Sequence, residues 1–133
     1  MTRPTRWIPA GLILAGVLAY ANSFSGVLIL DDLPHILDNP GIRHLGPWRA
    51  VVSGPGGIWR PLLQASFALN YVAGGLNPWG YHAVNLVIHL LAGLVLYGLV
   101  RRTLELPGIR RRDAIAPAPF AGAASLLWLV HPI

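Results

Sequence analysis

The chain has 133 residues, of which 54 % are hydrophobic and only 11 % are charged, and its formal net charge is +5. A soluble domain carries about 25 % charged residues, so this composition argues against a soluble protein and favours one embedded in lipid. All ten basic residues are arginines, and they cluster at the ends of apolar runs, which argues against a nucleic-acid partner. The absence of cysteine excludes disulfides, thiolate metal sites and a cysteine nucleophile.

The first apolar run follows a basic head that contains Arg3 and Arg6. Residues 7–30 are long enough to cross a bilayer as one helix, because about 20 residues span roughly 30 Å of hydrocarbon. A cleavable signal peptide fits the same pattern, with Ala19 to Ala21 as its cleavage triplet. An uncleaved span over residues 7–30 is the simpler interpretation, because two further hydrophobic segments follow.

Residues 31–80 are punctuated by prolines and glycines, which break a chain into turns and short helices. The longest apolar-patterned piece, Ile58 to Val72, predicts an interfacial helix with Pro61 in its first turn. We expect one stripe of this helix to contain Trp59, Leu62, Leu63, Phe67 and Leu69 or Asn70. Other aromatic residues of the region also suit the lipid headgroup zone: Trp48, Tyr71, Trp79 and Tyr81.

Two more spans are predicted after this loop. Residues 81–100 contain no formally charged side chain and end at Arg101-Arg102, which makes them the clearest transmembrane helix. A connector over 101–113 separates them from a third span over 114–130. The chain then stops at His131-Pro132-Ile133, and we expect a longer protein to continue beyond it.

The distribution of arginines predicts the orientation. The short head and the connector hold two and five arginines, whereas the loop over 31–80 holds three, which its three aspartates balance. The positive-inside rule therefore places the head and the connector in the cytoplasm and the loop on the outer face. The sequence thus predicts an all-α membrane protein with three transmembrane helices and an outer loop that contains short interfacial helices.

The acidic residues are concentrated where the outer loop begins, at Asp31, Asp32 and Asp38. If residues 27–30 end a helix, Asp31 and Asp32 lie at the lipid boundary, where desolvation and like-charge repulsion make a carboxylate a stronger base. The alternative is that both residues merely cap the outer end of a span, and for an isolated Asp-Asp pair this alternative carries more weight.

Polar residues also occur inside the second span. His82, Asn85 and His89 are spaced by three and four, so they are predicted to share one helix face, and polar groups at membrane depth face a protein interior or a wet cavity. His82 and His89 are about 10.5 Å apart along the axis, so this helix alone does not make a metal site. Interhelical hydrogen bonding by Asn85 and His89 is the alternative to a role in substrate binding.

Two more residues are candidates for substrate binding. The guanidinium of Arg60 can hold a phosphate at headgroup level, although reaching for lipid phosphate needs no substrate. His131, at the outer end of the third span, is equally ambiguous by itself.

Several short segments, in this order, resemble the opening of the transmembrane-and-tetratricopeptide-repeat proteins, which are relatives of the protein O-mannosyltransferases: Ala21 to Gly26, Asp31-Asp32, Asn39-Pro40, Gly57 to Leu63, Ser66 to Tyr71, Gly80 to His82 with Asn85 and His89, and Leu127 to Ile133. The resemblance runs over nearly the whole chain.

This resemblance implies part of a GT-C membrane domain, from an enzyme that moves a sugar from a polyprenyl-phosphate carrier to a protein acceptor on the outer face. Asp31 would then be the general base, and Asp32 would orient the acceptor or help hold a divalent cation. Arg60 would contact the carrier phosphate, and His82, Asn85 and His131 would line the site. Tetratricopeptide repeats would follow in a longer protein, and the 133 residues alone would be inactive.

The high content of alanine, glycine, arginine and proline indicates a bacterial inner membrane and an undecaprenyl carrier. Two other functions stay open from the sequence. The chain could be a non-catalytic membrane anchor or assembly module whose outer loop binds a protein partner. It could also be part of a transporter, for which the polar face of the second span is the best support.

Overall fold

The computed structural model describes residues 4–30, 32–43, 60–109 and 116–131. Every regular element in these residues is helical, which confirms the all-α class. The chain divides into two compact units, Met1–Asn22 with Asn85–Ile133, and Ser23–Val84. We call the first the helical unit and the second the loop unit.

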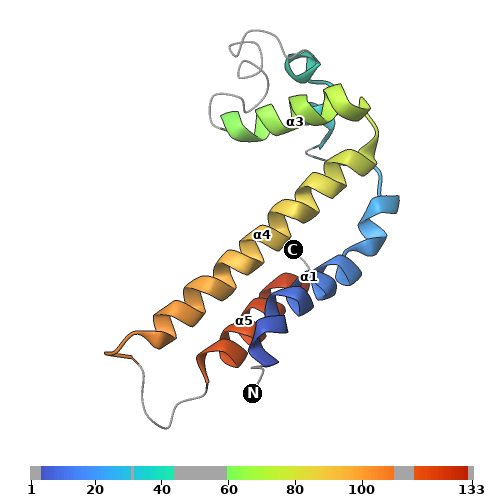
Figure 1. Cartoon of the computed structure of the whole chain (residues 1–133). Helices are drawn as coiled ribbons and strands as arrows, with labels where there is room; N and C mark the ends of the chain where they lie inside the picture. The colour runs from blue at the N-terminus through green and yellow to red at the C-terminus, as the bar shows by residue number, and fades with distance from the viewer. Residues whose placement is uncertain (1–3, 31, 44–59, 110–115, 132–133) are drawn as a thin grey trace. The chain divides into compact units, whose positions relative to one another are not determined.

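The helical unit contains the short η1 (Pro4–Trp7), α1 (Ile8–Ala19), most of α4 (Pro78–Glu105) and α5 (Pro117–Val130). Helices α1 and α5 pack side by side (Figure 1). Small residues let the helices approach closely, because a Cβ added at Gly93 would lie 2.6 Å from the Leu129 side chain and one at Gly122 would lie 2.9 Å from Ile8. Close packing over small residues is typical of helices in membranes.

Two helical stretches are long and apolar enough to cross a membrane, namely Thr5–Ser25 with 21 residues and Pro78–Glu105 with 28 residues. Many of their large apolar side chains point outward, as at Leu14 and Val95, which are 60 % and 70 % exposed. An apolar exterior of this size suits lipid rather than water, so the chain is a membrane protein. Helix α5 has 14 residues and spans only about 21 Å, so a third full crossing is not established by the described residues.

The first apolar run does not continue as one helix to residue 30. Helix α1 ends at Ala19, the 3₁₀ turn η2 covers Ala21–Ser25, and residues 26–30 are not helical. The Gly26 amide donates to the Ser23 carbonyl at 2.9 Å, and Leu30 has a φ of 51°, which a right-handed helix does not allow. The assumption that residues 27–30 end a helix is therefore wrong.

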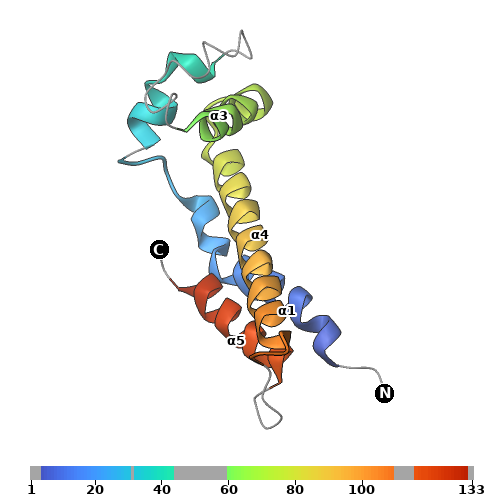
Figure 2. The ribbon, with the colours of Figure 1, turned by 90° about the vertical axis from the view of Figure 1, so that its left-hand side faces the viewer.

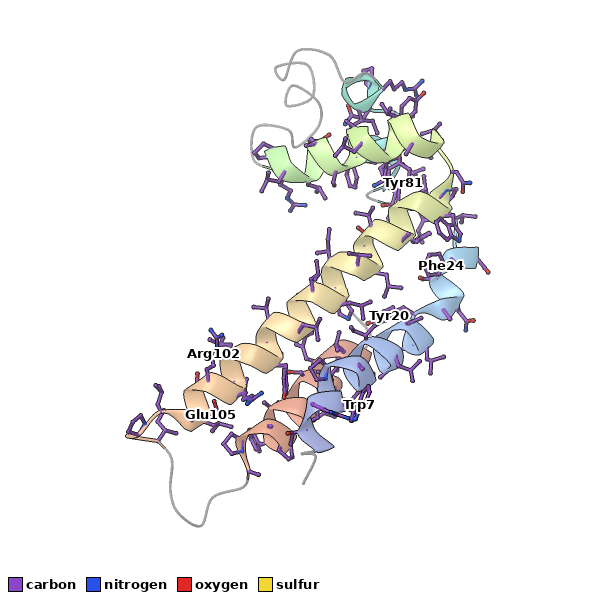
Figure 3. The ribbon with its side chains drawn as sticks, viewed as in Figure 1. Trp7, Tyr20, Phe24, Tyr81, Arg102 and Glu105 are labelled. Atoms are coloured by element: carbon purple, nitrogen blue, oxygen red, sulfur yellow. The ribbon has the colours of Figure 1, made fainter. Side chains whose placement is uncertain are left out.

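The loop unit contains η2, η3 (Leu33–Leu37), η4 (Pro40–Ile42), α3 (Pro61–Gly74) and the first residues of α4. Figure 2 shows η4 beside α3, and the two elements are in contact. Their shared core is a small cluster in which Phe67 and Leu28 pack against four buried residues: Ile36, Ile42, Ala68 and Tyr81. In Figure 3, Tyr81 lies where α4 begins beside α3.

Helix α3 overlaps the segment that was predicted as an interfacial helix, and its exposed and buried faces can now be assigned. Pro61 stands at its first position, as expected, because the missing amide proton costs nothing there. Leu62 and Leu69, however, are 82 % and 60 % exposed, whereas the buried residues are Gln64 and Ala68. The leucines therefore face outward and a polar side chain faces the core. The predicted residues Ile58 and Trp59 lie outside the described residues.

Candidate functional site

The acidic segment, defined here as residues 26–38, lies in the loop unit, where residues 26–30 are not helical and the π-turn η3 follows at Leu33–Leu37. Asp31 lies outside the described residues. Asp32 is partly exposed, and its Oδ2 accepts a hydrogen bond from the Ile29 amide at 3.2 Å. The Asp32 amide donates back to the Ile29 carbonyl at 3.0 Å. Asp32 thus closes a local turn with one of its two carboxylate oxygens.

His82 lies beside the start of the acidic segment. A Cβ added at Gly26 would meet the His82 Nε2 at 3.4 Å, so glycine at this position lets the backbone approach the imidazole. The Nε2 atom is buried and has no hydrogen-bond partner among the described residues. Nearby, the rings of Phe24 and Trp79 pack at 5.3 Å. A buried ring nitrogen without a partner can accept from or donate to a substrate, which keeps His82 a candidate for binding.

Arg60 precedes α3 at its N-terminus and is exposed. Its carbonyl accepts the first hydrogen bond of the helix, from the Gln64 amide at 3.1 Å, so the backbone of Arg60 is fixed although its guanidinium faces outward. The ion pair found in the described part of the chain joins Arg101 and Glu105 instead. Arg60 is thus placed to contact a phosphate, from a carrier or from the bilayer.

The sequence reasoning missed a buried amide pair formed by Asn39 and Gln64, both fully buried. The Asn39 Nδ2 donates to the Gln64 Oε1 at 2.9 Å and to the His35 carbonyl at 3.1 Å, while its Oδ1 accepts from the Gly41 amide at 2.9 Å. The available signal was the Asn-Pro dipeptide at residue 39, which is typical of a turn start. Nothing in the sequence indicated its partner 25 residues later.

A second polar cluster, in the helical unit, is formed by Tyr20, His89, Trp128 and His131. The His89 ring stacks on Trp128 at 4.8 Å, and its Nε2 lies 2.9 Å from the Leu129 carbonyl oxygen, so this nitrogen carries the proton. Tyr20 meets the His89 ring edge-on at 5.0 Å and donates to the His131 carbonyl at 2.9 Å. Carbonyls at a helix C-terminus lack hydrogen-bond donors within the helix. At the C-terminus of α5, His89 and Tyr20 donate these hydrogen bonds.

The three polar residues that were predicted to share one face of α4, His82, Asn85 and His89, therefore have different surroundings. His89 makes the interhelical hydrogen bond that was the alternative to substrate binding, and Asn85 is exposed. His82 belongs to the loop unit, whereas Asn85 and His89 belong to the helical unit. The side chain of His131 is exposed while its backbone is held by Tyr20. In the described residues, no group of three histidine or acidic side chains could hold a metal ion.

The fold and the outward-facing apolar side chains define the class, an all-helical membrane protein. Comparison with known proteins identifies its relatives. The chain is 38 % identical over 134 residues to protein O-mannosyl-transferase Tmtc1 of Drosophila melanogaster, an alignment that covers 92 % of the chain. It is 36 % identical over 132 residues to Tmtc2 of the same fly and 32 % identical over 142 residues to TMTC1 of Mus musculus, covering 90 % and 95 % of the chain.

The chain is therefore a homologue of the TMTC protein O-mannosyl-transferases, which confirms the resemblance to the transmembrane-and-tetratricopeptide-repeat proteins. It spans 14 % of the length of the fly Tmtc1 protein and 13 % of that of fly Tmtc2. No protein-family profile matches the chain. No solved structure matches it either.

Proposed function

We propose that this chain forms part of a membrane glycosyltransferase of GT-C type that moves a mannosyl group from a polyprenyl-phosphate carrier to a protein acceptor. The observation that carries the proposal is the similarity, over at least 90 % of the chain, to relatives that are named protein O-mannosyl-transferases. The acidic segment and the exposed Arg60, both in the loop unit, supply the residue types that such a transfer needs.

The transfer needs a base for the acceptor and positive charge for the departing phosphate. The acceptor hydroxyl oxygen attacks the anomeric carbon of the sugar, the bond between that carbon and the carrier phosphate breaks, and the hydroxyl proton passes to Asp31. Asp32 orients the acceptor through its second carboxylate oxygen or contributes to a divalent-cation site. Arg60 holds the carrier phosphate through its planar guanidinium.

His82 is the best supported of the residues proposed to line the site, because its buried Nε2 has no partner among the described residues and lies next to Gly26. Asn85 and His131 stay sequence-based predictions as substrate contacts. Both have exposed side chains, which is compatible with binding but does not single them out.

The proposed orientation has the N-terminus and the connector 101–113 in the cytoplasm of a bacterial cell, with loop 31–80 facing the periplasm. Three crossings, over about 7–30, 81–100 and 114–130, belong to this proposal, with the helical part of the first ending by Ser25. It rests on the arginine distribution. Reporter fusions at Gly56 and Gly108 should report opposite compartments, and reports from the same compartment would contradict the topology.

A non-catalytic membrane anchor whose outer loop binds a partner protein is the second candidate. The observation that favours it is the hydrogen bond from the Ile29 amide to the Asp32 carboxylate, because it gives this acidic residue a purely structural task.

The discriminating experiment is an assay of the intact protein, reconstituted in lipid vesicles, with a labelled mannosyl polyprenyl phosphate and a serine- and threonine-containing acceptor peptide. We expect time-dependent transfer of label to the peptide. Absence of transfer, with a positive control enzyme active in the same vesicles, would contradict the proposed function and favour the anchor.

A further inference from the structure

The amide pair of Asn39 and Gln64 is a fully polar contact inside the otherwise apolar core of the loop unit. Burying an amide costs on the order of 1–3 kcal/mol when its hydrogen bonds are not replaced. Here Asn39 makes three hydrogen bonds, to Gln64, His35 and Gly41, at 2.9 to 3.1 Å. Because hydrogen bonds are directional, such a contact fixes one arrangement where apolar packing alone would tolerate several.

The apolar neighbours of the pair show what it adds to the packing. Ile36 and Ile42 flank Asn39 in the chain, are 2 % and 0 % exposed, and pack in one cluster with Ala68. Ala68 lies one helical turn after Gln64 on α3, so the amide contact and the apolar contact are adjacent on the same helix face. The isoleucines thus hold the turn against α3, and the amides fix its register along the helix.

A hydrogen-bonded backbone connects the pair to the acidic segment. The Asp38 amide donates to the Leu33 carbonyl at 2.9 Å, and the Leu33 amide donates to the Leu30 carbonyl at 3.1 Å. The Asp32 amide in turn donates to the Ile29 carbonyl at 3.0 Å. Six residues in successive turns therefore separate Asp32 from Asn39, and a shift of Asn39 on α3 moves the Asp32 carboxylate with it.

On the other side of the contact, Gln64 lies in the first turn of α3, where its backbone amide donates to the backbone carbonyl of Arg60. The buried hydrogen bond between Asn39 and Gln64 thus joins the segment that carries Asp32 to helix α3, which begins after Arg60.

We propose that Asn39 and Gln64 act as a positioning pair that holds the acidic segment in register on α3, and so fixes the Asp32 carboxylate relative to Arg60 during transfer. Neither amide is proposed to touch substrate. This inference rests on the proposed function for its catalytic consequence, whereas the holding of the segment itself is independent of any reaction.

The test compares Asn39→Leu, Gln64→Leu and the double variant in the intact protein, with Gln64→Glu as the conservative variant that keeps an acceptor for Asn39. Asn70→Leu is the matched control, because Asn70 also lies on α3 but donates to Ser66 of its own helix, at 3.1 Å. The first readout is amide hydrogen exchange in peptides that cover residues 29–38.

We expect Asn39→Leu and Gln64→Leu to speed exchange in this segment about fivefold to tenfold, and Gln64→Glu and Asn70→Leu to leave it close to wild type. Unchanged exchange in Asn39→Leu and Gln64→Leu would overturn the proposal whatever the enzyme does. If Asn39→Leu does not accumulate, the comparison of Gln64→Leu with Gln64→Glu decides, since both leave the local bonds of Asn39 in place.

The second readout separates positioning from stability. Replacing both partners of a buried pair by apolar groups removes the cost of leaving one amide unpaired. The double variant should therefore regain that part of the lost thermal stability, whereas the part that comes from the bonds of Asn39 to His35 and Gly41 stays lost. Its kcat should nevertheless stay about tenfold to a hundredfold below wild type with little change in the KM for the carrier, because the register is still lost.

Recovery of kcat together with thermal stability in the double variant would mean that the pair is only structural. Faster exchange with wild-type kcat in the single variants would also overturn the positioning role. If the wild-type protein transfers no sugar, the proposed function fails, and the exchange readout alone decides whether the pair holds the segment.

Discussion

In the helical unit, contacts between helices run through glycines and alanines, as at Gly93 and Ala121, and large apolar side chains face outward. In the loop unit, a polar pair, Asn39 and Gln64, lies in the core beside a few apolar residues. The first pattern suits a lipid environment, where close packing rather than apolar burial holds helices together. The second suits a segment whose exact position matters, because buried polar contacts cost stability unless one geometry is kept.

The two units should therefore differ in which substitutions they tolerate. Substitution of exposed polar residues in the loop unit should affect function more than stability. Added side-chain volume between the helices of the helical unit should affect stability more than function.

The largest effect on stability is expected for Gly93→Ala. The added Cβ would lie 2.6 to 2.8 Å from three atoms of the Leu129 side chain, so either this side chain or the helices must shift. We expect a loss of about 1–3 kcal/mol in the free energy of unfolding. Gly98→Ala on the same helix is the control, since nothing lies within 4 Å of the new Cβ, and it should be neutral or slightly stabilising. Thermal unfolding in detergent micelles measures both, and equal melting temperatures would contradict close packing at Gly93.

Arg60→Lys should affect function without affecting stability. Lysine keeps the charge but loses the planar fork that binds a phosphate through two hydrogen bonds. Loss of one such bond should raise the KM for the carrier about fivefold, with the melting temperature unchanged. Saturation curves with the lipid donor test this. If Arg60→Lys gives the same saturation curve as the wild-type protein, Arg60 only anchors the chain at the membrane surface.

The smallest effect is expected for Tyr20→Phe, which keeps the edge-on contact with His89 but removes the hydrogen bond to the His131 carbonyl. Hydrogen bonds between membrane helices average about 0.6 kcal/mol, so the melting temperature should fall only slightly. His89→Phe, which keeps the stacking on Trp128, should cost a similar amount, and the two losses should be additive only if the two carbonyls are capped independently. A loss above about 2 kcal/mol for either would mean that the cluster does more than cap α5.

The sequence predicted the helices where a single local pattern dominated. The long uncharged run gave α4, and Pro61 correctly marked the start of α3. It did not predict that α1 ends at Ala19 and that the following 3₁₀ turn ends at Ser25, because residues 27–30 are as apolar as the helix before them and only the turn at Gly26 distinguishes them.

The inner face of α3 was also missed, for a physical reason. In a protein that meets lipid, leucines such as Leu62 can face outward, so an apolar stripe does not mark the core, and the buried face here carries Gln64. The pairing of Gln64 with Asn39 depends on the path of the chain between them, which no local pattern contains. At His89 the polar position was predicted, but its partner, a carbonyl of another helix, could only come from the structure.

The central claim is that the acidic segment carries the chemistry of a sugar transfer, with Asp31 as the base. It is tested most directly by comparing Asp31→Asn and Asp32→Asn in the reconstituted transfer assay, with Asp38→Asn, an exposed aspartate of the same segment, as the control. We predict that Asp31→Asn lowers the rate by about 10²- to 10⁴-fold with expression and carrier binding intact. Asp32→Asn should cost less, mainly through acceptor affinity, and Asp38→Asn should resemble wild type. Normal turnover by Asp31→Asn would contradict the claim, and an inactive Asp32→Asn beside an active Asp31→Asn would reverse the two roles.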